Sequence, residues 1–483
     1  MSSAVLAVDQ GTSGTKALVI CPERGVIGTG SVPVYPRYGP GDRAEVDPMS
    51  LLDSVIAAGR QALAEAGEPV AAVGLANQGE TVLAWDPSSG APLTEAIVWH
   101  DRRAESICTE LAPYADELAQ LTGLPLDPYF AAGKMAWIRR ERTREGVVTT
   151  SDAWLVHRLT GAFVTDAATA GRTQLLDLDD VTWSVRAREL FGLGSERMPE
   201  VVDSAGPVGT TTAFGATIPL TGLLVDQQAA LLAQSVTEPG AAKCTYGTGA
   251  FLLAQTGKSP LRTSSGLVSC VAWRLGGRTD YCLDGQVYTV ASAVRWLTEL
   301  GVISGAGDLD PIGSGVPDTG GVTFVPALAG LAAPWWRGDI RGSLSGLGLD
   351  TLPGHVVRAL CEGIAAQIAE LAAAAAGDLG QPLSVLRVDG GLTRSALLMQ
   401  TQADLLQIPI EVSALPDATA LGVGAVARMG IVPGLTIEQA VPRWEPAAVY
   451  EPAISADEAA QRLERFRMHV DQLLDRSSSR PNR

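Results

Sequence analysis

Asp9 is the first residue in the chain that could do chemistry. It follows the apolar run Val5–Val8, and a small, polar loop separates it from a second apolar run, Ala17–Ile20. Gly11 and Gly14 give the loop backbone freedom, so the two runs are typical of the arms of a β-hairpin. The loop is either an ordinary tight turn or a turn whose N–H groups approach an anion. In the second case Asp9 would hold a metal ion against that anion.

Two further glycine-containing turns could approach a nucleotide. Residues 241–255 run from one apolar stretch through a Gly-Thr-Gly turn into another. Residues 386–412 contain a strand ending in Asp389, a Gly-Gly pair and a helix that we expect to begin near Arg394. Such a turn before a helix favours a bound anion, but it is also an ordinary compact connection. Because each half of the chain opens on a similar hairpin, the sequence predicts a duplicated α/β unit with a cleft between the copies.

Two well-known nucleotide motifs are excluded by their spacing. Lys258 follows a glycine as in a P-loop, but that loop needs another glycine at the position of Leu252. Gly422 and Gly424 begin like a dinucleotide-binding pattern, but Ala427 stands at its third glycine and the opening strand is missing. A nucleotide would therefore be held by another architecture.

Composition places the chain among globular proteins of more than one domain. It has 483 residues, 46% of them hydrophobic and 18% charged, and two domains are the simplest division. The net charge of −17 argues against a general nucleic-acid or anionic-membrane surface. The sequence shows neither a signal peptide nor an uncharged apolar stretch of about 18 residues, and its six cysteines have no short paired spacing. We expect a cytoplasmic protein with reduced thiols and no membrane partner.

Hydrophobic spacing indicates the elements that would position these turns. Residues 50–66 and 355–378 carry apolar side chains at helical intervals. The apolar runs 322–328 and 384–388 are typical of core strands. Both halves thus supply strands and helices, as expected for an α/β protein.

Several blocks of sequence together resemble the FGGY carbohydrate kinases, and glycerol kinases most of all. The blocks lie between about Ala4 and Gly430 and include "VDQGTSGTKALV", "NQGETVLAWDPSSGAPLTEAIVWHDRR", "DQQAALLAQ", "TYGTGAFLL" and "LRVDGG". The resemblance implies the α/β fold of the actin-like ATPases, with two RNase H-like domains and an active-site cleft between them. Residues 1–234 would hold the acceptor pocket, the phosphate loop and the catalytic base, and residues 235–483 would bind ATP.

The same resemblance implies roles for residues that face ATP and Mg²⁺. Asp9 would bind Mg²⁺ through water, and Lys16 stands where glycerol kinases usually have arginine. Asp226 has the position of the catalytic base, which takes the proton of an alcohol as the phosphoryl group arrives. Ser395 stands where glycerol kinases usually have asparagine. The implied nucleotide-binding residues are Thr12, Ser13, Gly14, Lys16, Thr248, Gly249, Ala291, Arg295, Gly391 and Ser395.

The implied acceptor pocket departs from glycerol kinases at one position. Gly79 replaces the arginine of the usual Asn-Gln-Arg-Glu, which removes five donors and a charge and opens space beside Glu80. Either a neighbour such as His100 or Arg102 fills the gap and glycerol is used, or a longer acceptor occupies it. We expect the longer acceptor, a four- or five-carbon polyol or a ketose. The implied substrate-binding residues are Gly79, Glu80, Trp99, Tyr129, Asp226 and Gln227.

The expected function is an ATP- and Mg²⁺-dependent kinase that phosphorylates a hydroxyl of a small polyol or sugar. One alternative is a glycerol kinase proper. An alternative of another class is a nucleotide-binding sensor without catalysis, which the loss of Asp9 or Asp226 would favour, but both carboxylates are present. No nucleic-acid partner is expected, and a homodimer is left open.

Overall fold

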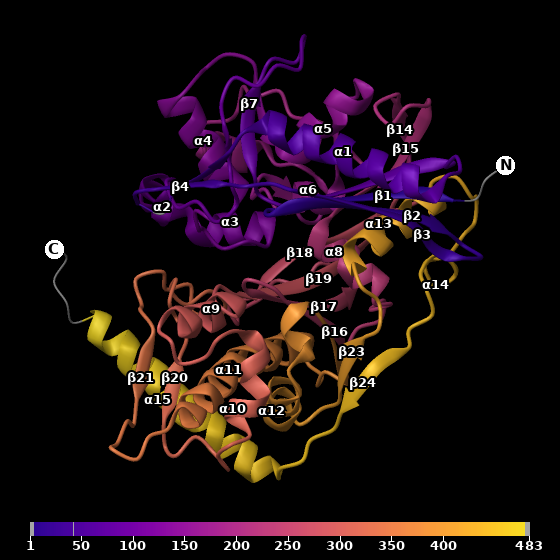
Figure 1. The fold of residues 1–483 in the computed structure, drawn as a ribbon. Coiled ribbons are helices and arrows are strands. Elements are labelled where there is room, and N and C mark those ends of the chain that lie inside the picture. The colour runs from indigo at the N-terminus through magenta and orange to yellow at the C-terminus, as the bar shows by residue number, and fades with distance from the viewer. Residues whose placement is uncertain (1–3, 42, 479–483) are drawn as a thin grey trace.

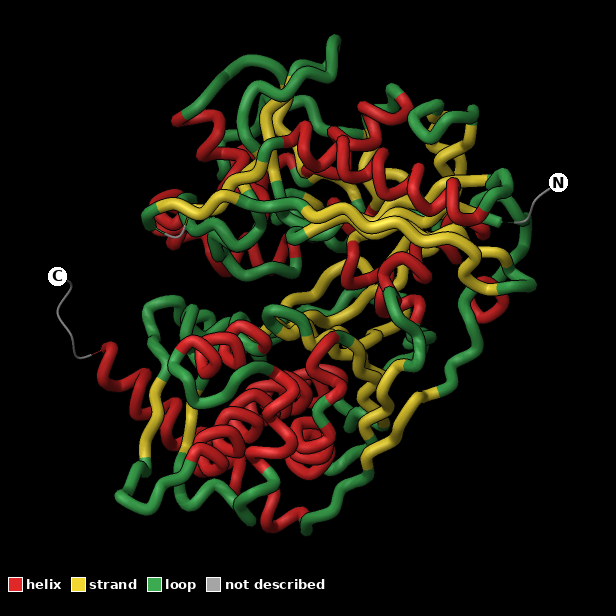
Figure 2. The backbone as a smooth tube through the Cα atoms, in the orientation of Figure 1, coloured by secondary structure: helices red, strands yellow, loops and turns green. Residues whose placement is uncertain are grey.

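The chain forms two α/β units, each built around its own sheet (Figure 1). The computed structural model describes residues 4–41 and 43–478. Helix α8 (Asp226–Ala233) lies between the units and contacts strands of both sheets. Further helices flank the sheets (Figure 2). The α/β class and the arrangement of two units with helices, as predicted, are confirmed.

The N-terminal half contains a six-stranded and a five-stranded sheet. The order of the first is β14–β15–β6–β1–β2–β3, and that of the second is β4–β5–β8–β7–β9. Their strands are β1 (Val5–Gln10), β2 (Gly14–Cys21), β3 (Gly25–Pro33), β4 (Arg37–Gly39), β5 (Arg43–Val46), β6 (Ala72–Asn77), β7 (Val82–Trp85), β8 (Ala96–Ile97), β9 (Val147–Thr150), β14 (Ala205–Thr211) and β15 (Ile218–Val225). The helices of this half, besides α8, are α1 (Pro48–Ala66), α2 (Glu105–Leu111), α3 (Ala115–Thr122), α4 (Ala131–Glu141), α5 (Ser151–Thr160), α6 (Ala167–Gly171) and α7 (Val185–Leu190), with a 3₁₀ turn at Ala112–Tyr114.

The C-terminal half is built on a seven-stranded sheet in the order β18–β19–β17–β16–β22–β23–β24. Its strands are β16 (Ala241–Tyr246), β17 (Ala250–Gly257), β18 (Val268–Leu275), β19 (Arg278–Val287), β22 (Val385–Asp389), β23 (Ile410–Ser413) and β24 (Pro446–Tyr450). Its helices are α9 (Ala291–Glu299), α10 (Leu309–Gly313), α11 (Pro353–Leu379), α12 (Ala396–Leu406), α13 (Ala418–Met429), α14 (Ile437–Ala440) and α15 (Ala456–Ser478), with 3₁₀ turns at Ala306–Asp308 and Gly391–Arg394. Two-stranded ladders pair β10 (Val164–Asp166) with β13 (Glu200–Val202), β11 (Leu176–Asp177) with β12 (Thr182–Trp183), and β20 (Thr323–Val325) with β21 (Ser343–Ser345).

The two halves repeat one local topology, as the paired hairpins predicted. Strand β1 pairs antiparallel with β2 and parallel with β6. Strand β16 likewise pairs antiparallel with β17 and parallel with β22. In both cases the hairpin turn lies at the carboxyl end of a central strand, where α/β sheets bind ligands.

The reason for glycine in the first turn differs from the one expected. Neither Gly11 nor Gly14 has a positive φ, so left-handed backbone freedom is not what the turn requires. A Cβ on Gly14 would lie 2.9 Å from the carbonyl oxygen of Val32 on the neighbouring strand β3. Glycine at position 14 therefore allows two backbones to approach closely.

Helix α13, from the second half of the sequence, packs on the sheet of the first half. It contacts β1, β6 and β15, while α1 covers the opposite face. Strand β1 alternates accordingly, because Leu6 and Val8 lie in the core beside α1 and Ala7 lies in the core beside α13. A Cβ on Gly422 of α13 would stand 1.9 Å from the carbonyl oxygen of Ala229 on α8. This glycine of the rejected dinucleotide pattern thus allows close packing of two helices.

The elements expected from hydrophobic spacing are present with small shifts. Helix α1 begins at Pro48, because the Asp47 side chain accepts a hydrogen bond from the Met49 N–H and proline suits a first helical turn. The expected strands 322–328 and 384–388 correspond to β20 and β22. The expected helix start near Arg394 is wrong by two residues, because 391–394 form a 3₁₀ turn and the Ser395 hydroxyl caps α12.

Two features of the core bear on the expectations from composition. Helix α11 is long and apolar enough to cross a membrane, but 72% of its most apolar window is buried inside the protein. It packs against β17, β19 and β20. All six cysteines are free and buried, as expected for reduced, packed thiols.

Candidate active site

Asp9 stands at the carboxyl end of β1, close to two other carboxylates. Burial, together with the negative charges of Asp226 and Asp417, raises the pKa of Asp9 to about 8, and the Lys16 ammonium opposes this shift. Lys16, a residue of β2, forms an ion pair at 2.5 Å with Asp417, which directly precedes α13. Asp417 was not foreseen from the sequence, and only the packing of α13 on the N-terminal sheet brings it to Asp9. This excess of negative charge is the kind of site that a divalent cation stabilises.

The loop after β1 joins the expected phosphate site to the acceptor pocket. The Trp99 indole N–H donates to the Thr12 hydroxyl oxygen at 2.8 Å, and the Thr12 hydroxyl donates to Gln78 Oε1 at 3.2 Å. With its hydroxyl engaged in this way, Thr12 has its backbone N–H to offer a phosphate. Ser13 is exposed at the tip of the loop, and its carbonyl accepts from the Val34 N–H at 3.0 Å.

Asp226 is the first residue of α8, and the Gln227 N–H donates to its carboxylate at 2.7 Å. Burial and the nearby Glu80 carboxylate raise the pKa of Asp226 to about 6, against the influence of the Lys243 and Arg172 charges. Lys243, a fully buried residue of β16, donates to Gln227 Oε1 at 2.6 Å. The structure therefore gives Asp226 a pKa below neutrality, so that the carboxylate is ionised and able to accept a proton at pH 7.

Glu80 and two of the aromatic rings that were expected to line the acceptor pocket lie close together. Glu80 is buried and adopts a left-handed φ of 56°, a conformation that costs free energy and is often found at functional sites. The Trp99 ring meets the Tyr129 ring edge to face, with 5.6 Å between centroids. Burial raises the pKa of Tyr129, and Glu80 and Asp226 contribute to the shift, which places all three in one electrostatic environment. Phe251 of β17 approaches Trp99 from the C-terminal half at 6.1 Å.

The guanidinium beside Glu80 comes from Arg172, which sequence reasoning missed. Its Nε donates to Glu80 Oε1 at 2.6 Å. Arg102, named as a candidate to fill the gap at Gly79, instead forms an ion pair with Asp127 at 3.8 Å. His100, the other candidate, stacks on Tyr38 and contacts Trp99 with its ring. A Cβ on Gly79 would meet Val225 Cγ2 at 3.2 Å, and the remaining space around it is open.

Lys134 holds together the backbone that carries both aromatic rings. Its buried ammonium donates to the carbonyl oxygens of Trp99, Pro128 and Phe130 at 3.0–3.1 Å, and also to that of Tyr129. Burial lowers the pKa of Lys134 to about 8. The lysine lies in the stretch "DPYFAAGKMAWI", and nothing in this sequence pattern separates it from a surface lysine.

The expected nucleotide residues of the C-terminal half surround two adjoining turns. The carbonyl of Thr248 accepts from the N–H groups of Val290 and Ser292, which fixes the hairpin turn against the start of α9. A Cβ on Gly249 would lie 2.4 Å from the Val287 carbonyl oxygen, so only glycine fits there. Ala291 is the first residue of α9 and Arg295 lies one turn later, with an exposed side chain.

The third glycine turn lies beside the second hairpin. A Cβ on Gly390 would stand 2.3 Å from the Tyr246 carbonyl oxygen, so these two backbones touch, whereas Gly391 faces open space. The Ser395 hydroxyl donates to Asp310 Oδ1 at 2.5 Å and accepts from the Leu398 N–H. Its proton is thus committed to Asp310, and a contact with adenine remains a prediction.

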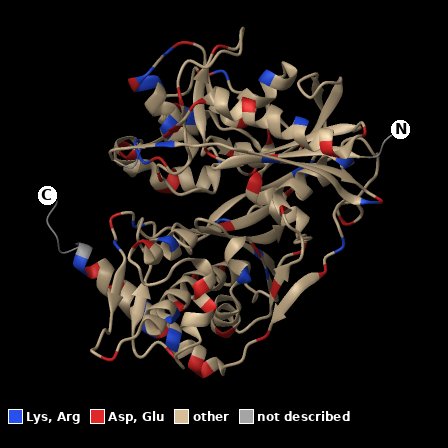
Figure 3. Ribbon diagram, viewed as in Figure 1, with Lys and Arg blue, Asp and Glu red and all other residues tan. Residues whose placement is uncertain are grey.

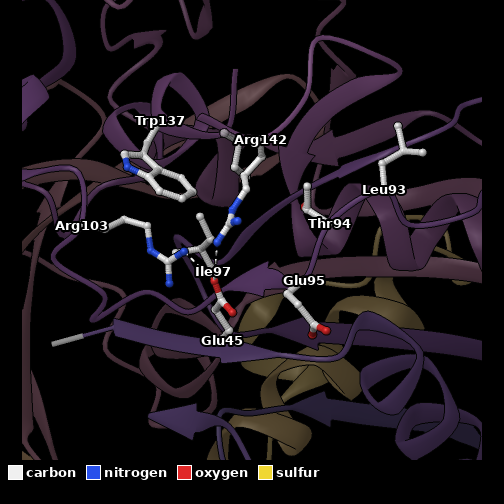
Figure 4. Close-up of a pocket in the computed structure, with 9 residues that line it drawn as sticks. Glu45, Leu93, Thr94, Glu95, Ile97, Arg103, Trp137 and Arg142 are labelled. Carbon is white, nitrogen blue, oxygen red and sulfur yellow. Dashed lines mark hydrogen bonds and ion pairs between the residues drawn. The ribbon is translucent and has the colours of Figure 1, made fainter. Parts of the chain in front are cut away.

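A cavity of about 270 Å³ in the N-terminal half is separate from these residues (Figure 4). The guanidinium groups of Arg103 and Arg142 lie 4.8 and 5.2 Å from the Trp137 ring centre, and Glu45 faces both arginines. Arg103 also binds Asp101, two residues after Trp99. None of the residues implied in catalysis or binding lines this cavity, and we assign it no part in the reaction.

The carboxylates around Asp9 suit a magnesium ion that is also bound by water and substrate phosphates. They do not suit a metal ion that is bound by protein side chains alone. In the part of the chain that the structure describes, no group of three or more His, Cys, Asp or Glu side chains is arranged to hold a metal. Mg²⁺ keeps several waters and is usually bound by one or two carboxylates together with substrate phosphates. Asp9, with its pKa raised by the nearby Asp226 and Asp417, would be the carboxylate that holds such an ion.

Comparisons with known proteins agree with this geometry. The N-terminal domain of the FGGY family of carbohydrate kinases matches residues 4–233, and the C-terminal domain of that family matches residues 242–431. The chain is 39% identical to the glycerol kinase of Aromatoleum aromaticum, over 97% of this chain and 98% of that one. It is 41% identical to the glycerol kinase of Alkalilimnicola ehrlichii, over 95% and 96% of the two chains.

A solved structure shares the whole architecture. The crystal structure of Plasmodium falciparum glycerol kinase with ADP superposes with a TM-score of 0.89, at 30% identity and with 98% of each chain covered. The matched regions include both hairpins, Asp9, Asp226 and the Gly390–Gly391 turn. The chain therefore belongs to the FGGY family of carbohydrate kinases, which transfer a phosphoryl group to an alcohol.

Proposed function

We propose that this protein is an ATP-dependent glycerol kinase. The observation that carries the proposal is the Arg172–Glu80 pair, which returns a guanidinium to the acceptor pocket despite Gly79. The Glu80 carboxylate, held in place by this guanidinium, can accept hydrogen bonds from the hydroxyls of a small polyol, and the Trp99 and Tyr129 rings cover its carbon chain. The relatives that are named glycerol kinases support glycerol over the longer acceptor expected from Gly79 alone.

The proposed mechanism gives each half of the chain its own task. Residues 1–234 would hold the acceptor and the phosphate loop, and residues 235–483 would hold ATP through the turns at Thr248–Gly249 and Gly390–Gly391. Asp226 accepts the proton of the attacking hydroxyl, since its pKa of about 6 leaves it ionised at neutral pH. Mg²⁺, bound through water at Asp9, would neutralise charge on the phosphates. Backbone N–H groups of residues 12–14 orient the transferred phosphoryl group.

An acceptor panel tests the proposal directly. We expect kcat/KM for glycerol to exceed that for erythritol, threitol, xylitol, ribitol and xylulose, because the relatives named glycerol kinases match this chain over nearly its whole length. The measurement is coupled ADP production with purified protein, ATP and Mg²⁺. A higher kcat/KM for any four- or five-carbon acceptor would show that the space at Gly79 sets specificity, and would contradict glycerol as the acceptor.

A further inference from the structure

Arg172 joins the two halves of the protein inside the active site. It follows α6 in the N-terminal half, and its Nε donates to Glu80 Oε1 at 2.6 Å. Its Nη1 lies 2.7 Å from Oδ2 of Asp284, a residue of β19 in the C-terminal half. Helix α6 also packs against β18, the neighbour of β19. One side chain therefore connects the acceptor carboxylate to the nucleotide-binding half.

The three charged side chains are buried and depend on one another. Arg172, Glu80 and Asp284 are each no more than 5% exposed. Burial raises the pKa of Glu80 and of Asp284, and the Arg172 charge opposes both shifts. Within the described residues, Asp284 Oδ1 accepts no hydrogen bond, and the charges of Arg172 and Lys243 both oppose the rise in the pKa of Asp284. Removing one member would leave a buried charge without its partner, which is costly.

Packing leaves the Arg172 guanidinium little freedom to move. It lies 5.7 Å from the Tyr129 ring centre and 5.6 Å from that of Phe130. Charge-assisted hydrogen bonds from a planar guanidinium fix direction as well as distance. The orientation of Glu80, whose backbone is already strained at a φ of 56°, is thus set by a group that the other half of the chain holds in place.

We propose that Asp284 is a positioning residue for the acceptor, and that it acts through Arg172 on Glu80 so that the acceptor site is complete only when the two halves are docked. This inference rests on the proposed function. Glycerol bound at Glu80 and nucleotide bound to the C-terminal half then stabilise the same docked arrangement. By linkage, each ligand must raise the affinity for the other by the same factor.

The test compares two ion pairs that both cross between the halves. Asp284→Asn keeps the shape of the side chain and removes its charge. Asp203→Asn is the matched control, because Asp203 pairs with Arg274 of β18 at 2.7 Å, outside the acceptor pocket. The measurements are KM for glycerol, and the calorimetric Kd of glycerol and of a non-hydrolysable ATP analogue, each with and without the other ligand.

We expect Asp284→Asn to raise KM for glycerol roughly 10- to 100-fold, the effect of losing a hydrogen bond to a charged group, with the calorimetric Kd of the ATP analogue, measured without glycerol, changed less than about twofold. The factor by which the analogue tightens glycerol binding should fall towards one. Asp203→Asn should leave both quantities near the wild-type values. Asp284→Glu keeps the negative charge on a longer side chain, so this variant should retain part of the glycerol affinity.

Three outcomes would contradict the inference, and a fourth would contradict the proposed function. An unchanged coupling factor in Asp284→Asn, or equal rises in the Kd of glycerol and of the ATP analogue when each is measured alone, would show that Asp284 has only a structural role. If Asp284→Asn does not fold, as judged by its melting curve, Asp284→Ser takes its place, and a wild-type KM for glycerol in that variant overturns the proposal. A wild-type protein that does not bind glycerol contradicts the proposed function instead, and the comparison is then repeated with the best acceptor of the panel.

Discussion

Asp226 is a buried carboxylate that must be ionised to act as a base. Its pKa of about 6 lies above the ordinary value of 3.8 because burial and Glu80 disfavour the charge. The native protein therefore holds a proton between about pH 4 and 6 that the unfolded chain has lost. In this window stability falls as pH rises, and above pH 6 the full cost of the buried charge is present.

The first prediction concerns Asp226→Asn. We expect turnover to fall by about 10²–10⁴-fold, since the amide keeps the shape but accepts no proton. At pH 7.5 the ligand-free variant should be more stable than the wild type by up to about 3 kcal/mol, the equivalent of the pKa difference. Chemical denaturation at pH 7.5 and pH 4 measures this, and the gain should vanish at pH 4.

The exposed Asp180 provides the control, because its side chain lies on the surface, outside the site. Asp180→Asn should leave turnover at the wild-type value. If Asp226→Asn kept wild-type turnover, another group would have to be the base.

At the scale of elements, helices α8 and α13 fix the relation between the carboxylates. Helix α8 carries Asp226 at its first residue, and α13 follows Asp417 directly. Their contact at Gly422 and Ala229 leaves no room for a side chain. A change at this crossing should therefore disturb both stability and the cluster around Asp9.

The second prediction tests this crossing with Gly422→Ala. A methyl group 1.9 Å from the Ala229 carbonyl oxygen must push the helices apart, at a cost of about 1–3 kcal/mol or more. Gly377→Ala is the matched control on α11, because nothing lies within 4 Å of the added Cβ and alanine is the better helix former. Thermal melting should show a lower Tm for the first variant and an equal or higher Tm for the second. The opposite order would mean that the helices are free to adjust.

At the scale of the whole molecule, residues of both halves meet at the proposed acceptor pocket. Trp99 contacts Tyr129 from its own half and Phe251 from the other. Positions of Lys and Arg alternate with those of Asp and Glu along the ribbon of both halves (Figure 3). The contacts between the halves include those of α6 with β18, of α8 with β17 and of α13 with β1, β6 and β15.

The third prediction belongs to the scale of the whole molecule. We expect Phe251→Ala, a change in the C-terminal half, to weaken binding of the acceptor in the N-terminal half. Loss of the ring leaves Trp99 without its partner from β17, and an aromatic pair of this kind contributes about 0.5–1.5 kcal/mol beyond its buried area. We expect KM for glycerol to rise roughly tenfold, with KM for ATP nearly unchanged. Phe324→Leu, in the core beside α11, serves as a control for a general loss of packing. Equal effects on both KM values would place Phe251 outside the acceptor pocket.

The sequence by itself determined the local pieces of the site. Apolar runs interrupted by small residues predicted both hairpins, and the structure places Asp9 at the end of the strand where the pattern put it. Alternation and helical spacing predicted α1 and α11 within two residues at each end. These features are encoded by neighbours in the chain, because strand and helix periods repeat over a few residues.

Only the tertiary structure decided which distant groups meet. Arg172 reaches Glu80 across 92 positions, and Lys16 reaches Asp417 across 401. Neither partner has a local pattern that marks it, since an isolated arginine or aspartate is typical of a solvated surface. The Arg172–Glu80 pair follows from the packing of α6 beside β15 within the N-terminal half, and the Lys16–Asp417 pair from the docking of α13 on the N-terminal sheet. The charges of the active site are thus set by long-range packing, which the spacing of residues in one sequence does not record.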